Sequence, residues 1–162
     1  MRNATLCFPV DLCDGKVEFL WLGMKRVRFG AGRWNGFGGK VEEGETVEAA
    51  TVRELQEESF LIAKVEDLIP IARLMFRWPH KPKWNMNVYA FCVSDYTGNA
   101  LQTEEMRPCR FDADSIPYED MWPDDEVWLP YALRLDGFVR GAFTFTEDGK
   151  LAIWDVRYQR NQ

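Results

Sequence analysis

Three glutamates, Glu54, Glu57 and Glu58, stand at helical spacing within the stretch Gly38–Ile62. On a helix that advances about 100° per residue they fall within an arc of about 100°, so three carboxylates share one side. Without a counter-charge they would repel one another. A hard divalent cation explains such a cluster, because Mg²⁺ takes oxygen ligands and is often shared with substrate phosphates. The alternative is an acidic helix face that is simply solvated.

The side of this helix opposite the acids is predicted to be its buried face. Ala49, Val52 and Leu55 point away from the acidic arc and are expected to pack against a sheet, which would leave the acids facing a cleft. A run with five glycines, Phe29–Gly39, leads directly into the helix. Glycines let a backbone approach a ligand closely. The run matches neither a Walker loop nor a dinucleotide fingerprint, so alone it is weak evidence for phosphate binding.

The spacing around the helix is more specific than its composition. Gly39 is followed six residues later by Glu45 and then, after seven further residues, by Arg53–Glu58. This spacing resembles the Nudix box, with one departure: Phe60 stands where the pattern has its last glycine. That glycine is expected to end the helix in a left-handed turn. The departure therefore concerns the helix exit rather than the chemistry.

Blocks outside the box narrow the resemblance to the oxidised purine nucleoside triphosphatases of the MutT group. The blocks are Gly23–Lys25, Phe29–Val41, Glu105–Cys109 and Asp120–Asp125. The resemblance implies an α+β Nudix fold, a mixed β-sheet sandwiched between α-helices. It also implies a metal-dependent enzyme that hydrolyses oxidised purine nucleoside triphosphates such as 8-oxo-dGTP to the monophosphate and pyrophosphate, which would remove damaged nucleotides from the pool before DNA synthesis.

The same resemblance implies roles for the acidic residues. Mg²⁺ is the expected cofactor, with Mn²⁺ as an alternative, and its implied ligands are Gly39, through its carbonyl, Glu54, Glu57, Glu58 and Glu105. The implied catalytic residues are Arg53, Glu57, Glu58 and Glu105. Which glutamate takes the proton of the attacking water stays open, because coupled carboxylates around a metal do not have separately readable roles. Arg53 is assigned to an ion pair that orients the ligands, with an ordinary i,i+4 surface pair as the alternative.

A second set of residues is predicted to bind the substrate. Asn35 offers a donor and acceptors for a purine edge, and Trp122 offers a stacking face. Asp124 and Asp125, side by side in an apolar pocket, would raise at least one pKa, so that a neutral acid donates while its partner accepts. The resemblance implies that this pair recognises 8-oxo-purines, and helix N-terminal capping is the alternative. Lys25 is a predicted phosphate contact, with a plain surface lysine as the alternative. The remaining predicted contacts are Thr5, Phe29, Phe76 and Trp78, and for the three aromatic residues ordinary core packing is the alternative.

The elements that must position these residues follow from local patterning. A second helix is expected over Asp124–Leu135, because Pro123 suits a first helical turn and acids favour a helix N-terminus. Three hairpins are expected from runs of strand-forming residues around polar turns. Their strands are Thr5–Val10 with Val17–Leu22, Ile69–Trp78 with Trp84–Val93, and Phe143–Thr146 with Leu151–Val156. Strands before, between and after two helices fit an α+β fold.

Composition sets the remaining expectations. The 162 residues, 46% of them hydrophobic, fit one globular domain over residues 1–162. A net charge of -6 argues against a protein that binds a nucleic acid polymer through its phosphate backbone. The four cysteines form no Cys-x-x-Cys pair and are expected to be reduced. No signal peptide pattern or membrane-length apolar run is present, so a cytoplasmic protein away from membranes is expected. A monomer is also expected.

Two rival functions stay open at this point. One is a Nudix hydrolase acting on another nucleoside diphosphate derivative, such as ADP-ribose or a dinucleoside polyphosphate. The other is a non-catalytic nucleotide-binding module. The only histidine, His80, lies in a predicted turn and is expected to be solvated rather than part of a Ser-His-Asp or Cys-His mechanism.

Overall fold

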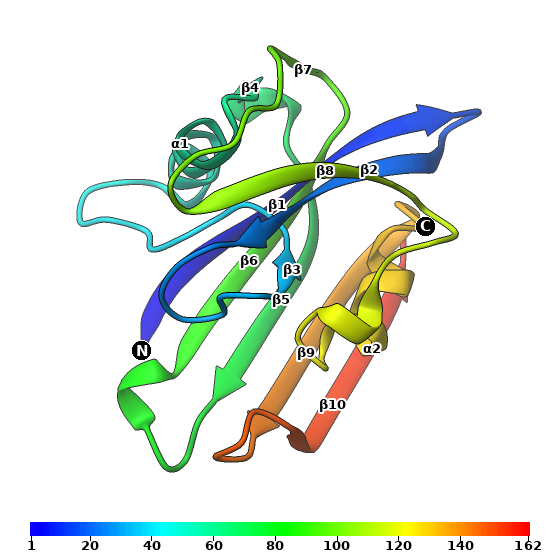
Figure 1. Cartoon of the computed structure of the whole chain (residues 1–162). Coiled ribbons are helices and arrows are strands. Elements are labelled where there is room, and N and C mark those ends of the chain that lie inside the picture. The colour runs from blue at the N-terminus through cyan, green and yellow to red at the C-terminus, as the bar shows by residue number, and fades with distance from the viewer.

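The computed structural model describes residues 1–162 and is built around a mixed sheet (Figure 1). The strand order is β10-β9-β5-β6-β1-β2-β3, and β8 also pairs with β2. The strands are β1 (Arg2–Cys13), β2 (Lys16–Lys25), β3 (Trp34–Asn35), β5 (Ile69–Arg77), β6 (Met86–Val93), β8 (Met106–Asp112), β9 (Gly137–Phe145) and β10 (Leu151–Arg160). The β1–β6 and β5–β9 pairs are parallel, and the other pairs are antiparallel. A small separate sheet joins β4 (Ile62–Ala63) to β7 (Tyr96–Thr97).

The long strand β1 fixes the glycine-rich segment. The backbones of Cys7 and Phe37 exchange two hydrogen bonds of 2.6 and 2.9 Å, and the N–H of Thr5 donates to the carbonyl of Gly39 at 2.9 Å. At Gly38 an added Cβ would lie 1.8 Å from the carbonyl oxygen of Thr5. Only glycine allows this approach, so the sequence requirement at position 38 is steric.

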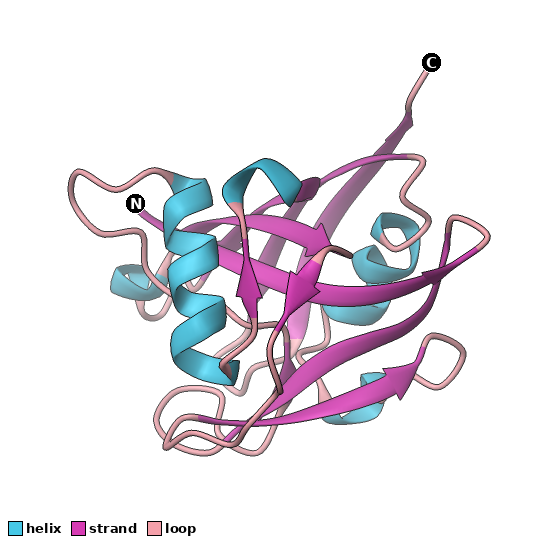
Figure 2. Cartoon of the chain, turned by 90° about the horizontal axis from the view of Figure 1, so that it is seen from above, coloured by secondary structure: helices cyan, strands magenta, loops and turns pink.

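The two helices, α1 (Val47–Ser59) and α2 (Asp125–Ala132), cover opposite faces of the sheet. Neighbouring residues on a strand point to opposite faces. On β1, Phe8 belongs to the larger buried cluster, together with Trp128 of α2, whereas Cys7 belongs to the smaller cluster, together with Leu55 of α1. Figure 2 shows α1, the longest helix, lying across the neighbouring strands. The predicted α+β arrangement, a mixed sheet between helices, is confirmed.

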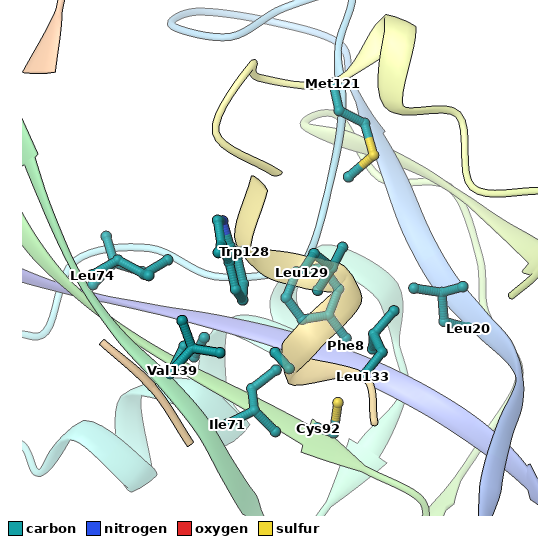
Figure 3. Close-up of a cluster of buried hydrophobic side chains, with 14 of the residues drawn as sticks. Phe8, Leu20, Ile71, Leu74, Cys92, Met121, Trp128, Leu129, Leu133 and Val139 are labelled. Atoms are coloured by element: carbon teal, nitrogen blue, oxygen red, sulfur yellow. The ribbon is translucent and has the colours of Figure 1, made fainter. Parts of the chain in front are cut away.

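The larger cluster is the main hydrophobic core. It gathers side chains from β1, β2, β5, β6, β9 and α2 around Trp128 (Figure 3). Trp128, Phe8 and Leu129 are fully buried, and the Phe8 and Trp128 rings meet edge to face with centroids 6.1 Å apart. This core anchors the N-terminal turn of α2, which carries two of the predicted binding residues.

The predicted buried face of α1 is partly wrong. Leu55 is buried, but Ala49 and Val52 are only half-buried, and the buried residues are Ala50, Thr51, Leu55, Glu58 and Ser59. The buried face of α1 is rotated from the predicted one because two polar side chains on it are hydrogen-bonded. The hydroxyl of Thr51 donates to Val47 O at 2.8 Å, and the hydroxyl of Ser59 donates to Leu55 O at 2.6 Å. A satisfied hydroxyl is buried at little cost.

Several element bounds differ from the predicted ones. The second helix ends at Ala132 rather than Leu135, which takes a left-handed φ of 57°. The strands of the three hairpins are present but mostly longer than expected, and Trp84 lies in a short 3-10 turn, η2 (Pro82–Trp84), rather than on β6. Two further 3-10 turns are η1 (Val65–Asp67) and η3 (Tyr118–Asp120). The strands β3 and β8 were not predicted.

Other expectations are met. Phe60 takes the left-handed turn expected at the helix exit, with φ 66° and its N–H bonded to Gln56 O at 2.9 Å. His80 is exposed, and all four cysteines are free thiols. None of the helices combines the length and the apolar composition that crossing a membrane requires.

Candidate active site

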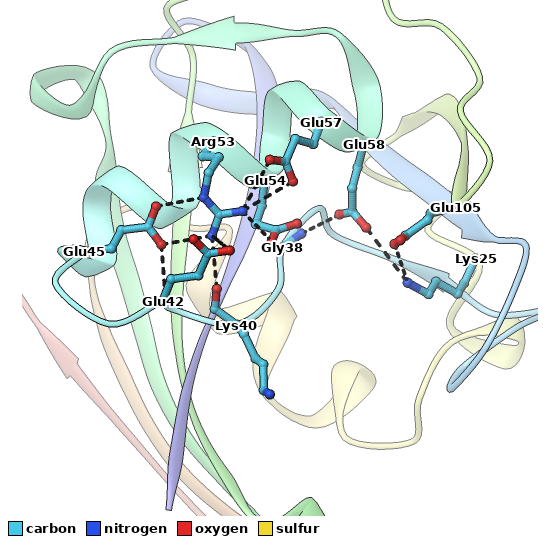
Figure 4. A network of polar contacts seen from close by, with 10 residues as sticks. All are labelled: Lys25, Gly38, Lys40, Glu42, Glu45, Arg53, Glu54, Glu57, Glu58 and Glu105. Atoms are coloured by element: carbon cyan, nitrogen blue, oxygen red, sulfur yellow. Dashed lines mark hydrogen bonds and ion pairs between the residues drawn. The ribbon is translucent and has the colours of Figure 1, made fainter.

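Arg53 is the centre of an ion-pair network on α1 (Figure 4). Its guanidinium makes two bonds to Glu45, of 2.7 and 2.9 Å, and also contacts Glu54 at 2.9 Å, Glu57 at 3.3 Å and the carbonyl of Lys40 at 3.2 Å. The hydrogen bonds from Arg53 lower the pKa of Glu45 to about 2. Glu57, the i,i+4 partner, is thus only one of several groups that Arg53 holds. The geometry favours the orienting role over an ordinary surface pair.

The three box glutamates have different environments. Glu57 is exposed, whereas Glu58 is 4% exposed and accepts a hydrogen bond of 2.8 Å from the N–H of Gly38. Burial raises the pKa of Glu58 to about 8, and burial also raises the pKa of Glu54. Lys25 lies 3.9 Å from Glu58 and partly offsets that shift.

Glu105 is brought to the same place from the loop before β8. Its carboxylate contacts Lys25 at 3.2 Å and also pairs with Arg28. The backbone N–H of Arg26 donates to the carbonyl of Glu105 at 2.8 Å, which ties the two loops together. Lys25 therefore bridges Glu105 and Glu58 (Figure 4). We call Glu54, Glu57, Glu58 and Glu105 the acidic cluster.

The acidic cluster fits a hard divalent cation in its donor chemistry. All predicted ligands are oxygens, which Mg²⁺ prefers, and two of the carboxylates are kept from solvent, where a cation would relieve the cost of burial. At Gly39 an added Cβ would lie 2.7 Å from the Glu54 carboxylate, so the backbone there is open to it. The side chains are not gathered into a coordination shell: no three His, Cys, Asp or Glu side chains are grouped as a metal site. Arg53 and Lys25 neutralise them instead.

A cavity of about 230 Å³ opens beside the acidic cluster. All nine predicted substrate-binding residues line it: Thr5, Lys25, Phe29, Asn35, Phe76, Trp78, Trp122, Asp124 and Asp125. We call this cavity the base pocket. It shares Lys25, Gly38, Gly39 and Glu58 with a second cavity of about 740 Å³ that holds Glu54, Glu57 and Glu105. The two cavities therefore form one continuous site.

The two aspartates of the base pocket are both 3% exposed. Asp124 accepts a hydrogen bond of 2.9 Å from the indole N–H of Trp128, and the Oδ2 atom of Asp125 is buried with no partner. Burial raises the pKa of Asp124 to about 6. Burial and the charge of Asp124 raise the pKa of Asp125 well above its usual range. The buried, unpartnered oxygen and the raised pKa both favour the protonated form of Asp125, which can donate a hydrogen bond.

Helix capping does not explain these aspartates. Asp124 occupies the N-cap position of α2 but makes no side-chain capping bond. No capping bond holds the Asp124 side chain, and both aspartates line the base pocket.

Asn35 and Trp122 are held in fixed orientations. The Oδ1 atom of Asn35 accepts from the N–H of Gly36 at 2.9 Å, so its amide NH₂ group is the part left to meet a ligand. The guanidinium of Arg33 lies 4.3 Å from the centroid of the Trp122 ring and donates to Met121 O at 3.0 Å. Arg33 was not predicted as a site residue, and only its position in the glycine-rich run could have suggested it.

The other lining residues serve both packing and the pocket. Trp78 is buried and stacks on Phe145 with centroids 4.4 Å apart and planes at 9°. Phe76 packs against Phe145 at 5.7 Å. The hydroxyl of Thr5 pairs with that of Thr51, so Thr5 fastens α1 to β1 beside the pocket. Phe145 and Met86 also line the pocket and were missed, since nothing in their local spacing marks them.

Comparisons with known proteins agree with this geometry. The NUDIX domain family matches residues 2–132. The chain is 43% identical over 136 residues to a mouse protein named oxidized purine nucleoside triphosphate hydrolase, covering 84% of this chain and 85% of that protein. A zebrafish protein of the same name is 46% identical over 124 residues, covering 76% and 77%.

Solved structures support the fold alone. A MutT protein from Bacillus halodurans superposes with a TM-score of 0.82 at 23% identity and covers 96% of this chain and 97% of that one. The family match spans most of the chain and includes the glycine-rich segment, the acidic helix and both aspartates. The chain therefore belongs to the Nudix family.

Proposed function

We propose that this protein hydrolyses oxidised purine nucleoside triphosphates such as 8-oxo-dGTP to the monophosphate and pyrophosphate, with Mg²⁺ as its cofactor. One observation carries the proposal: a base pocket with a buried, unpartnered Asp125 is continuous with the acidic cluster. The names of the mouse and zebrafish relatives agree with this substrate class.

The base pocket offers a set of donors and acceptors suited to a purine edge. Neutral Asp125 donates, ionised Asp124 accepts, and the free NH₂ group of Asn35 donates. Trp122 offers its ring for stacking. A purine bound here would direct its phosphates past Lys25 into the cavity of the acidic cluster.

At the phosphate end, Lys25 and Arg28 supply positive charge for the phosphate chain. Glu54, Glu57, Glu58, Glu105 and the carbonyl of Gly39 would hold the metal. When bound, Mg²⁺ neutralises phosphate charge and activates the attacking water. The proton of that water passes to a carboxylate of the acidic cluster, and Arg53 keeps Glu54 and Glu57 in position.

The test of this proposal is product analysis with 8-oxo-dGTP. We expect one pyrophosphate and one monophosphate per turnover in Mg²⁺, and no turnover in EDTA. Release of orthophosphate, or faster cleavage of ADP-ribose or a dinucleoside polyphosphate, would contradict the proposed substrate class. Hydrolysis that ignores EDTA, Glu57→Gln and Glu58→Gln would show that the acidic cluster is not the site.

We also propose that residues 1–162 act as one domain, as a cytoplasmic monomer. Light scattering of the purified protein at working concentration tests the monomer, for which we expect the mass of one chain, 18.9 kDa. A concentration-dependent doubling of mass would overturn it.

A further inference from the structure

Trp84 was not predicted as a site residue, but it lines the cavity of the acidic cluster and contacts Phe29, which lines both cavities. It ends the 3-10 turn η2 in the connection between β5 and β6. Its ring centroid lies 4.7 Å from that of Phe29 and 5.4 Å from that of Trp78, and the ammonium of Lys81 lies 3.9 Å from its centroid. These contacts hold the indole of Trp84 against Phe29 and Trp78, two aromatic residues of the base pocket.

Phe29 is the most exposed aromatic residue of the base pocket. It is 46% exposed, and its neighbours Arg28 and Gly30 both have left-handed backbones, with φ 64° and 87°. Its ring stacks on Trp122 with centroids 5.1 Å apart and planes at 25°. The Phe29 ring therefore contacts the rings of both Trp122 and Trp84.

The spacing between Phe29 and Trp122 limits what can stack there. A base inserted between two rings needs them about 7 Å apart, twice the optimal carbon–carbon contact distance. The observed 5.1 Å is too short, so Phe29 must move for a base to stack on that face of Trp122. Trp84, already in contact with Phe29, opposes that movement.

We propose that Trp84 is a positioning residue that determines specificity: it supports Phe29 and limits how far the base pocket opens. The inference rests on the proposed function. A pocket that opens only slightly admits flat purines with small substituents and disfavours purines with bulky groups. Removal of the indole lets the Phe29 ring retreat and relaxes this selection.

The experiment compares Trp84→Ala and Trp84→Phe with a matched control, Trp154→Ala, which removes a half-exposed indole on β10. The substrates are 8-oxo-dGTP and O6-benzyl-dGTP. For Trp84→Ala we expect KM for 8-oxo-dGTP to rise roughly 2- to 10-fold, the range that one aromatic contact supplies, with kcat nearly unchanged. The preference for 8-oxo-dGTP over the benzyl compound should fall by a similar factor. Trp84→Phe should restore most of it, and Trp154→Ala should match the wild type.

Two outcomes would overturn the inference. One is an unchanged preference in Trp84→Ala, and the other is an equal loss of kcat on both substrates in both Trp84 variants, which indicates a general structural role. If the wild type cleaves no purine triphosphate, the proposed function fails first. Binding of 8-oxo-dGMP, followed by tryptophan fluorescence, then still tests Trp84: equal affinity of the wild type and Trp84→Ala would count against it.

Discussion

In the acidic cluster, the carboxylates of Glu54 and Glu105 lie within 3.2 Å of Arg53 or Lys25. In the base pocket, by contrast, Asp124 accepts a hydrogen bond from the neutral indole of Trp128, and the Oδ2 atom of Asp125 has no partner. The charge of Arg33 reaches the aspartates only at longer range and lowers their pKa values less than burial raises them. Lysine and arginine side chains pair with Glu54 and Glu105, whereas burial raises the pKa values of both aspartates. One cavity thus offers acceptors for a metal at one end and a donor for a base at the other.

Glu58 is the exception that tests this comparison most severely. It belongs to the acidic cluster but is buried, as the aspartates are, and burial raises its pKa to about 8. We expect Glu58→Gln to lower kcat by about 10²–10⁴-fold, because a ligand and candidate base is lost while the side-chain shape is kept. Pyrophosphate release measures it, with Glu48→Gln, an exposed acid in the first turn of α1, as the control. Activity above a tenth of the wild type would place the reaction elsewhere.

The next largest effect concerns the base pocket. Asp124→Asn and Asp125→Asn should each lower kcat/KM for 8-oxo-dGTP by roughly 10- to 100-fold, since a hydrogen bond to the base is lost or inverted. The fold should survive, because an amide fills the same space. Asp120→Asn, an exposed neighbour, is the matched control. Unchanged turnover in both Asp124→Asn and Asp125→Asn would contradict a role of these aspartates in base recognition.

The same aspartates should make stability depend on pH in a defined direction. An unfolded aspartate has a pKa of about 3.9, and burial raises the pKa of Asp124 to about 6 and that of Asp125 further. The folded state therefore binds protons more tightly, so their contribution to stability is complete below about pH 4 and is lost as pH rises through the folded pKa values.

Asp125→Asn stays neutral and escapes that loss. We expect it to exceed the wild type in free energy of unfolding at pH 8, with the gap closing toward pH 4. Urea denaturation at several pH values measures the gap, and Glu58 titrates in both proteins and cancels. A gap that does not vary with pH would mean that Asp125 is not the protonated group. Gained stability with lost activity is the trade-off expected at a strained site.

The two regions also differ in how far the sequence predicted them. Three members of the acidic cluster follow from spacing, because a helix brings positions 54, 57 and 58 to one side, whereas Glu105 was inferred from resemblance. The base pocket does not: Asn35 on β3 and Asp124 at the start of α2 lie far apart in sequence, and no local pattern brings them together. Their grouping was inferred from resemblance, and the structure places both in one cavity.

What local patterning missed has physical reasons. The strand β3 has only two residues, and β8 contains Pro108 and several charged residues, so neither has a clear strand pattern. The buried face of α1 was misjudged because Thr51 and Ser59 satisfy their hydroxyls internally. The supporting roles of Arg33 and Trp84 depend on ring contacts between distant segments, which no spacing rule encodes.

The smallest effect that we predict concerns Phe60, which ends α1 and lines neither cavity. Phe60 holds a left-handed φ of 66° where the family pattern has glycine, and its ring is half-exposed. A left-handed backbone destabilises the folded state by roughly 1–2 kcal/mol for a residue with a Cβ. Glycine removes this strain, but it also makes the unfolded chain more flexible, which offsets part of the gain. Phe60→Gly should therefore raise the free energy of unfolding by about 0.5–1 kcal/mol.

Phe60→Ala is the matched control, because it removes the same ring but keeps the strained backbone, and it should show no gain. Turnover of 8-oxo-dGTP should stay within twofold of the wild type in both variants, since Phe60 lines neither cavity. Urea denaturation beside a pyrophosphate assay measures both quantities. A large loss of activity in Phe60→Gly would mean that the exit turn helps to hold Glu58, two residues before it, and that the acidic cluster depends on this irregularity after all.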